Sequence, residues 1–268
     1  MKFASLGSGS EGNALLISTA SGADRTTVML DCGFNIKETE RRLQRRGMVP
    51  ADLSGIVVTH EHQDHVGGVF KFARRHHLPV WLSFGTFHAV RKDCDGVQYR
   101  FCRDGEPLSI GHLELIPYTV PHDAREPVQY VVRDGRFKLG VLTDAGQATQ
   151  HLTQSLSGCD ALVLECNHDR GMLANSSYPP SLRSRIGGAY GHLSNDTTAD
   201  ILAALDRSRL KIVVGAHLSQ QNNTPELARA ALSSVIDGDT ARIMIACQED
   251  GFDWISLDAL ADQAGEDS

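Results

Sequence analysis

The chain has 268 residues, a formal net charge of −7 and 22% charged residues. This length is at the upper end for one hydrophobic core, and no linker or charge run divides it, which predicts one domain over residues 1–260 and a disordered tail over residues 261–268. The sequence shows neither a signal-peptide pattern nor an apolar stretch long enough for a membrane span, so we expect a cytoplasmic protein with no membrane partner. Oligomeric state is not indicated.

The first two predicted strands, residues 2–6 and 13–18, are joined by a glycine-rich loop. Residues Gly7–Gly12 form a literal GxGxxG, and Asp31 follows about 20 residues later, as in the dinucleotide-binding fold. An NAD-binding oxidoreductase is therefore the alternative function from a different class. That fold requires a helix directly after the glycines, whereas residues 13–18 and 27–30 have the pattern of two further strands.

Residues 36–46 are predicted to form a helix, with Asn35 as its N-cap and Gly47 at its end. The helix carries a basic cluster, Arg41-Arg42 with Arg45-Arg46. A solvated helix face explains such a run more often than a binding groove does.

The strand predicted over residues 55–59 runs directly into the sequence His60-Glu61-His62-Gln63-Asp64-His65. Three imidazoles and a carboxylate within six positions are ligand types that can hold two divalent metal ions side by side. Ligands at alternate positions suit a tight loop, because a regular helix would place them at i and i+4. Gly67-Gly68 and a predicted helix over residues 69–77 follow, so the motif lies at a strand-to-helix turn. A solvated polar turn is the alternative.

Three later predicted strands each end at one further ligand-type residue. These strands and the residues that follow them are 112–120 with His122, 137–143 with Asp144, and 211–215 with His217. A lone histidine in such a place is more often a hydrogen-bonded structural residue than a ligand. Three such strand ends, in addition to the first motif, favour a metal site.

A further predicted strand, residues 160–165, ends at Glu165, and a polar loop connects it to a predicted helix over residues 195–206. Ser194 or Asn195 would cap this helix, whose N-terminus attracts anions such as phosphate. The loop is either a solvated connector or a mobile lid whose guanidinium groups hold phosphate oxygens. The candidate substrate-binding residues are His168, Arg170, Arg183, Arg185 and Ser194. The last predicted helix is residues 224–236, with Pro225 at its first position.

Composition bears on both cysteine chemistry and nucleic-acid binding. The six cysteines lack CxxC spacing, which predicts reduced structural residues, with Cys166 as a candidate minor metal ligand. An acidic balance is unfavourable for nucleic acid, whose affinity comes chiefly from Lys and Arg, although the cluster over residues 74–77 directly follows the metal motif and its helix. Aromatic residues are only 6% of the chain, so sequence-independent contact is favoured over a broad base-stacking platform.

The order of these motifs, HxHxDH followed by His, Asp and His, resembles the metallo-β-lactamase superfamily over nearly the whole chain. The resemblance implies an α/β fold, a four-layer αββα sandwich of two mixed β-sheets flanked by helices. It also implies two metal ions that share one carboxylate, with the ligand sets His60, His62 and His122; Asp64, His65 and His217; and the bridging Asp144. Imidazole and carboxylate ligands without thiolate favour Zn or Mn and also accept Fe. An aspartate in the fourth motif is similar to the glyoxalase II and RNase Z branches, whereas true β-lactamases have a cysteine there.

His192 lies two residues before Ser194, and Glu165 lies at the preceding strand end, an arrangement that resembles RNase Z-like phosphodiesterases. In those enzymes such a histidine donates a proton and the glutamate orients it. Residues 8–13, 167–169 and 216–219 together resemble the YycJ/WalJ group, whose members are associated with trimming of DNA from the 5′ end.

We therefore expect a binuclear metal-dependent phosphodiesterase, an exonuclease acting on DNA in the 5′-to-3′ direction. In this hypothesis a metal-bridging hydroxide attacks phosphorus and His192 protonates the leaving group. The expected catalytic residues are His192, Glu165 and Asp64. Alternatives that use the same ligands are a small-molecule cyclic phosphodiesterase, a glyoxalase II-like thioesterase and a metal-binding protein without turnover.

Overall fold

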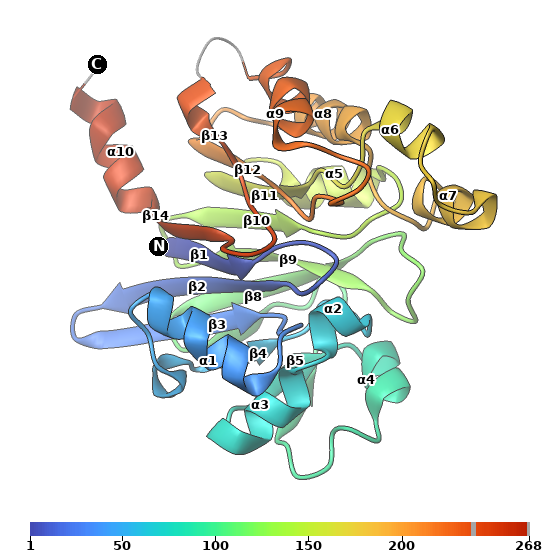
Figure 1. Cartoon of the computed structure of the whole chain (residues 1–268). Coiled ribbons are helices and arrows are strands. Elements are labelled where there is room, and N and C mark those ends of the chain that lie inside the picture. Colours follow the sequence, from blue (N-terminus) through green and yellow to red (C-terminus); the bar gives the residue numbers. More distant parts are fainter. Residues whose placement is uncertain (237–239, 267–268) are drawn as a thin grey trace.

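The computed structural model describes residues 1–236 and 240–266, which form two seven-stranded β-sheets packed face to face with helices on both outer faces (Figure 1). The strands of the first sheet are β1 (Lys2–Gly7), β2 (Ala14–Ser21), β3 (Asp24–Leu30), β4 (Gly55–Val57), β5 (Val80–Leu82), β6 (Tyr99–Phe101) and β14 (Phe252–Ser256). They are ordered β14-β1-β2-β3-β4-β5-β6. The pairs from β14 to β3 are antiparallel and the pairs from β3 to β6 are parallel.

The second sheet repeats this mixed arrangement. Its strands are β7 (Leu108–Ile110), β8 (Leu113–Thr119), β9 (Val128–Arg133), β10 (Lys138–Leu142), β11 (Ala161–Glu165), β12 (Ile212–Ala216) and β13 (Ile243–Ile245). They are ordered β13-β12-β11-β10-β9-β8-β7. The pairs among β7 to β10 are antiparallel and those among β10 to β13 are parallel. The predicted pair of mixed sheets is therefore confirmed.

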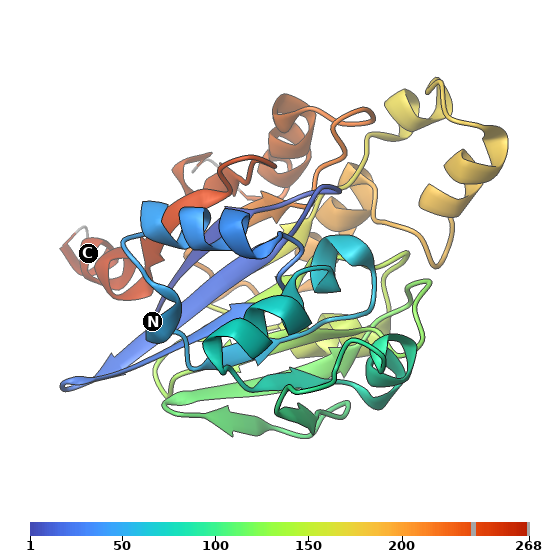
Figure 2. The ribbon, with the colours of Figure 1, turned by 60° about the horizontal axis from the view of Figure 1, so that its bottom comes forward.

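Helices cover the outer face of each sheet. Those that pack on the first sheet are α1 (Ile36–Arg45) and α3 (Val69–His76), and those on the second are α5 (Gln150–Leu156), α8 (Asn195–Ala204) and α9 (Pro225–Ser233). The remaining helices are η1 (Pro50–Asp52), α2 (Gln63–Val66), α4 (Phe84–Val90), α6 (Arg170–Ala174), α7 (Pro180–Ile186), η2 (Thr240–Arg242) and α10 (Leu257–Glu266). In Figure 2, α6 and α7 extend from one end of the sandwich.

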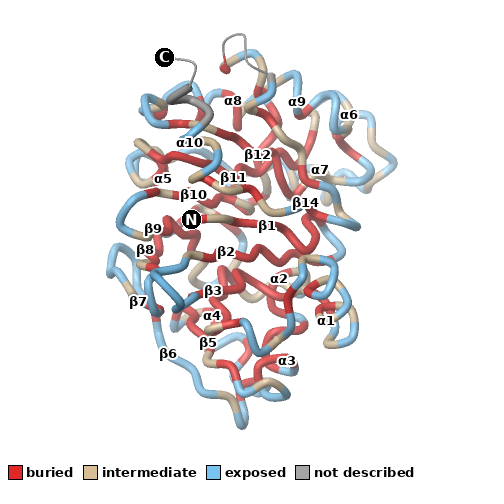
Figure 3. The backbone as a smooth tube through the Cα atoms, turned by 90° about the vertical axis from the view of Figure 1, so that its left-hand side faces the viewer, coloured by how far each residue is buried: buried red, intermediate tan, exposed pale blue. Residues whose placement is uncertain are grey.

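A strand points successive side chains to opposite faces of its sheet. Both faces are covered here, one by the other sheet and one by helices, so apolar side chains are buried on both. In β2, Leu15 and Ile17 enter the core between the two sheets, whereas Leu16 packs in the layer under α1 and α3. A third apolar cluster lies under α5, α8 and α9. Figure 3 shows the resulting buried strands within a shell of exposed loops and helix faces. This alternation explains why the strands appear as nearly continuous hydrophobic runs in the sequence.

The strand predicted after the glycine loop is confirmed: β2 follows Gly7–Gly12, where a dinucleotide-binding fold requires a helix N-terminus, so the fold does not support that alternative. The sequence predicts a disordered tail over residues 261–268; α10 extends to Glu266, and residues 267–268 lie outside the described part of the chain. Across the described residues, no helix combines the length and the apolar character that crossing a membrane requires.

Candidate metal centre

The first motif lies where β4 ends and a single turn of helix begins. His60 and His62 occupy the connecting loop, whereas Asp64 and His65 belong to α2. The predicted strand-to-helix turn is confirmed. We expected a tight loop to carry all four ligands, but the helix already begins at Gln63, so Asp64 and His65 lie within it. Hydrogen bonds from Asn13 N to Asp64 O (2.7 Å) and from Cys32 N to His65 O (2.8 Å) fix this turn against the N-terminal loops.

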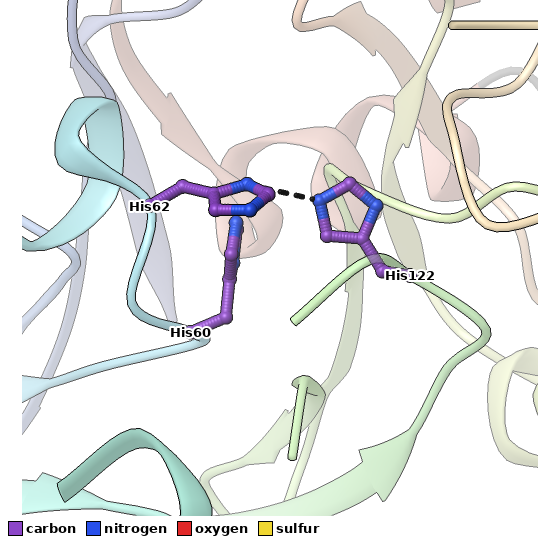
Figure 4. Close-up of side chains that lie close together, drawn as sticks. All are labelled: His60, His62 and His122. Carbon is purple, nitrogen blue, oxygen red and sulfur yellow. Dashed lines mark hydrogen bonds between the residues drawn. The ribbon is translucent and has the colours of Figure 1, made fainter. Parts of the chain in front are cut away.

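Three histidine rings converge at one side of the centre (Figure 4). Nε2 of His122 is 3.2 Å from Nδ1 of His62, and the His60 ring centroid lies 4.6 Å from that of His62. Nδ1 of His122 donates to the carbonyl of Gly191 at 2.9 Å, which leaves Nε2 free to face the centre. The Nε2 atom of His60 is buried and has no hydrogen-bond partner among the described residues. Such an orphaned nitrogen fits a metal ligand, because buried polar atoms otherwise find partners.

Two carboxylates and two imidazoles gather at the other side. Oδ2 of Asp64 is 3.3 Å from Nε2 of His65 and 3.3 Å from Nε2 of His217. Oδ2 of Asp144 lies 3.1 Å from Nε2 of His65, and this oxygen also lacks a hydrogen-bond partner among the described residues. Asp144, His65 and His60 have ligand atoms within 4.8 Å of one another, so Asp144 lies between the two groups.

Asp31 supports this arrangement, a role that the sequence did not reveal. Its Oδ2 accepts a hydrogen bond from His65 Nδ1 at 2.8 Å, and its two oxygens also accept from the amide and hydroxyl of Thr59, each at 2.8 Å. A carboxylate behind an imidazole fixes the tautomer that presents Nε2 to a metal. In the sequence Asp31 entered only as the acidic residue of the dinucleotide alternative. One signal could have revealed this role: Asp31 directly follows β3, and β3 is the neighbour of β4, the strand that leads into the first motif.

His192 and Glu165 form a second functional pair beside the ligands. Nδ1 of His192 donates to Oε1 of Glu165 at 2.7 Å, and Oε2 of Glu165 accepts from the amides of Ala145 (2.9 Å) and Leu193 (3.1 Å). Burial opposes a charge on His192, but the carboxylates of Glu165 and Asp144 outweigh it and raise its pKa to about 10. The His192 side chain remains 23% exposed and lines two cavities, so a substrate can reach it.

Electrostatics divide the histidines of the centre into two kinds. Burial and the neighbouring imidazoles lower the pKa of His60, and burial lowers that of His122, so both favour the neutral form that binds metal. Burial opposes a charge on His65 and His217 as well, but Asp144 and Asp64 raise the pKa of His65 well above its ordinary value and that of His217 to about 9. Carboxylates that attract a proton so strongly would attract a divalent cation in the same place, and the donor set therefore fits metal ions.

Cys166 does not join this donor set. Glu165 at the end of β11 points into the centre, and the next residue points to the opposite face, where Cys166 packs in the apolar cluster under α8 and α9. Burial raises the pKa of its thiol to about 12. The prediction of Cys166 as a minor ligand is therefore wrong.

The predicted polar loop contains α6 and α7, and its arginines differ in their contacts. Nε of Arg185 binds Asp123 Oδ2 at 2.6 Å, and the Arg183 guanidinium donates to the carbonyl of Ala174. Arg170 donates to the hydroxyls of Ser194 and Thr197, both at 3.1 Å. Arg185 lines a cavity of about 410 Å³ that also contains Asp64, Asp144, His192 and His217. The other four predicted substrate-binding residues line a neighbouring cavity of about 500 Å³, and His192 borders both.

Comparisons with known proteins identify the family and the fold. The sequence profile of the beta-lactamase superfamily domain matches residues 26–217. Exodeoxyribonuclease YycJ of Bacillus anthracis is 34% identical over 240 residues, which cover 88% of this chain and 89% of that protein. Exodeoxyribonuclease WalJ of Streptococcus pneumoniae is 29% identical over 236 residues and 86% of each chain. Zn²⁺-bound PqqB from Methylobacterium extorquens has the same fold, with a TM-score of 0.71 at 15% identity over 96% of this chain and 100% of that one.

Proposed function

This chain belongs to the beta-lactamase superfamily, and on that premise we propose that it is a metal-dependent hydrolase that removes nucleotides from the 5′ end of DNA. The resemblance drawn from the sequence is thereby confirmed at the level of the family. The observation that carries the proposal is the position of His192, which is held by Glu165 and lies directly beside the metal-binding cluster. Two relatives of nearly equal length that carry the name exodeoxyribonuclease support the choice of substrate.

We propose that His60, His62 and His122 hold one divalent ion and that Asp64, His65 and His217 hold a second. Asp144 would bridge the two. When bound, such ions lower the pKa of water and neutralise charge on phosphoryl oxygens. Imidazole and carboxylate donors without thiolate suit Zn²⁺ or Mn²⁺, and Fe would also fit.

The residues of the chain itself supply the proton transfers. Water attacks phosphorus, the bond from phosphorus to the 3′ oxygen breaks, and His192 gives its Nε2 proton to that departing oxygen. Glu165 keeps the imidazole protonated and fixes the orientation of its ring, because Oε1 accepts a hydrogen bond from Nδ1 while two backbone amides hold Oε2. We propose that Asp64, whose Oδ2 lies 3.3 Å from Nε2 of His217, accepts the proton that the attacking water loses.

This direction of cleavage fixes the products. The terminal nucleotide leaves with a 3′ hydroxyl, and the shortened strand keeps the phosphate as its new 5′ end. Each cycle therefore produces a 5′-phosphorylated substrate for the next cycle. Sequence-independent recognition would suit this task, because every terminal nucleotide in turn must enter the same site.

The proposal is tested with DNA and RNA oligonucleotides, single- and double-stranded, labelled at either the 5′ or the 3′ end, together with metal analysis of the protein. We expect mononucleotides to appear from the 5′ end of DNA, in proportion to bound metal. Asp144→Ala should lose metal and activity, whereas His192→Ala should keep metal and lose rate.

The exposed His112 offers a matched control, since His112→Ala removes an imidazole remote from the cluster. Cleavage from the 3′ end, or turnover only of a small cyclic phosphodiester or a thioester, would contradict the proposed substrate. Normal DNA turnover by pure Asp144→Ala protein would contradict the assigned centre.

A further inference from the structure

The cavity on the far side of His192 is a separate compartment from the metal cluster. Its wall comes from α6, α7, the first turn of α8 and the segment after β11 that contains His168. We infer that this cavity binds the 5′-terminal nucleotide of the substrate strand and holds it by its 5′-phosphate. The inference rests on the proposed function, which it extends from the scissile phosphate to the phosphate at the end of the strand.

The lining of this cavity is cationic, although the chain as a whole has a net charge of −7. Among the described residues the lining contains two arginines and two histidines, Arg170, Arg183, His168 and His192, and no carboxylate. Acidic side chains outnumber basic ones by 33 to 26 in the sequence, so an acid-free lining is a local departure from the overall balance. Its charge is complementary to an anion.

Donors converge where α8 begins. Ser194 caps this ten-residue helix, and the helix dipole places partial positive charge at the cavity wall. The hydroxyls of Ser194 and Thr197 hold the guanidinium of Arg170 over the same helix end. Asp196 lies 3.5 Å from Arg170, but both side chains are more than 60% exposed, so this ion pair is weak and a phosphate can displace it.

His168 gives independent evidence for a ligand. The residue is only 3% exposed and forms part of the cavity wall, yet its Nδ1 has no hydrogen-bond partner among the described residues. Its backbone carbonyl accepts the amide of Asn195 at 2.9 Å, which fixes the residue against the start of α8. A buried imidazole nitrogen without a partner costs free energy unless a ligand or water satisfies it.

The chemistry of cleavage assigns this side of the centre to the terminal nucleotide. His192 borders both cavities, and the 3′ oxygen that it protonates belongs to the nucleotide that leaves. That nucleotide must therefore extend from His192 away from the metal ligands, into the cavity with Arg170 and His168. Leu173, Ala174 and Pro180 provide an apolar wall for its sugar and base without reading the sequence. A site for a terminal phosphate would also favour cleavage at an end over cleavage inside a strand.

Binding without turnover tests the inference. The full chain is kept in EDTA, and fluorescence anisotropy measures the Kd for single-stranded DNA that carries a 3′ fluorophore and either a 5′-phosphate or a 5′-hydroxyl. We expect the 5′-phosphate to tighten binding about tenfold, the effect of one charge-assisted hydrogen bond. Arg170→Ala and His168→Gln should reduce the ratio of the two Kd values toward one. Arg103 is 76% exposed and, within the described part of the chain, forms an ion pair with Glu106 alone; it provides the control variant Arg103→Ala, which should keep the ratio.

Equal binding of both 5′ ends by the wild-type chain overturns the inference, as does an equal gain from a phosphate placed at the 3′ end. Loss of the preference in Arg103→Ala overturns it too, because the effect would then be general electrostatics. Thermal midpoints show whether the variants are folded. End-labelled digestion with metal present tests the proposed function separately. If DNA is degraded without a 5′-phosphate preference in binding, the cavity assignment fails and the nuclease assignment stands; the reverse result leaves the cavity assignment and refutes the nuclease.

Discussion

Replacing Glu165 with glutamine removes the charge that keeps His192 protonated, while the size of the side chain is nearly unchanged. The carboxylate lies 2.7 Å from Nδ1 of His192, and the pKa of that histidine rises from 6.5 to about 10. If only the ordinary value of 6.5 remained, about 1% of His192 would be protonated at pH 8.5. Asp144 lies 3.3 Å from Nδ1, but bound metal ions would offset its charge, so Glu165 becomes the main source of the raised pKa and we expect kcat on DNA to fall roughly ten- to hundredfold at that pH.

The sign of the pH dependence follows from the raised pKa. His192 acts in its protonated form, so activity is present below its pKa in the folded protein and is lost as the pH rises through that value. In Glu165→Gln this alkaline limb should move to lower pH, and the deficit relative to wild type should shrink toward pH 6. A full pH profile of kcat for both proteins measures the displacement.

A second substrate distinguishes proton donation from structural damage. A nitrophenyl ester of a nucleotide releases p-nitrophenolate, which leaves without a proton, so Glu165→Gln should slow this substrate far less than DNA. Metal content should match that of the wild type. The free energy of unfolding should fall by about 1–3 kcal/mol because the buried hydrogen bonds of Glu165 are altered, and the thermal midpoint should show a corresponding small decrease. Equal losses on both substrates, or an unchanged rate on DNA at pH 8.5, would refute the role of the pair.

Three further predictions concern the metal ligands and the stability of the fold. Asp31→Asn, which keeps a side chain suited to the positive φ of 61° at this position, should weaken metal binding by about 10- to 100-fold, because His65 loses the charged acceptor of its Nδ1 proton; competition with a chelator measures this, and wild-type affinity would contradict it. Removal of metal should lower the thermal midpoint of the wild type, since a ligand present at 100 times its Kd stabilises a fold by about 2.7 kcal/mol, and Asp144→Ala should show a much smaller change; equal changes would disprove the assigned cluster. Arg41 and Arg42 hold the pKa of Glu38 to about 2, below its ordinary 4.5 and against the opposing effect of burial, so its contribution to stability is present above pH 4.5 and is lost as the pH falls toward 2. Glu38→Gln should therefore cost about 0.5 kcal/mol at pH 7, and urea unfolding should show this difference shrinking between pH 4.5 and 2; a difference independent of pH would rule out the ion pairs as its cause.

The candidate metal ligands could be predicted from the sequence because each lies at a strand end or in a short motif. His60, His62, Asp64 and His65 are neighbours in the chain, and His122, Asp144 and His217 each follow an apolar run. Parallel strands of one sheet end at the same edge, so residues that follow β10 and β12 must come close together. His192 and Glu165 were identified by their resemblance to a family, and the structure brings them to 2.7 Å. Local sequence pattern was therefore sufficient to predict residues whose proximity follows from strand order alone.

Surface arrangement was not predictable in this way. Composition argued against a stacking platform, yet Phe84, Phe87, Tyr99 and Phe101 gather around α4 and β6 with ring centroids 4.8 to 6.3 Å apart. A percentage counts rings and carries no information about where they lie. The arginines of the predicted loop likewise looked equivalent in sequence, whereas Arg185 is engaged by Asp123 and Arg170 lies over the start of α8.

The sequence by itself determined which side chains are candidate metal ligands and which strands and helices carry them, whereas His192 as the candidate proton donor came from the resemblance to a family. Hydrophobic alternation and capping act over a few residues, so the strands and helices follow from the local sequence. Only the tertiary structure decided that Asp31 orients His65, that Cys166 faces the core, and that His168 and Arg170 share a cavity beyond His192. Those relations depend on distances between segments far apart in the chain, which packing of the two sheets and their helices sets and which no local pattern encodes.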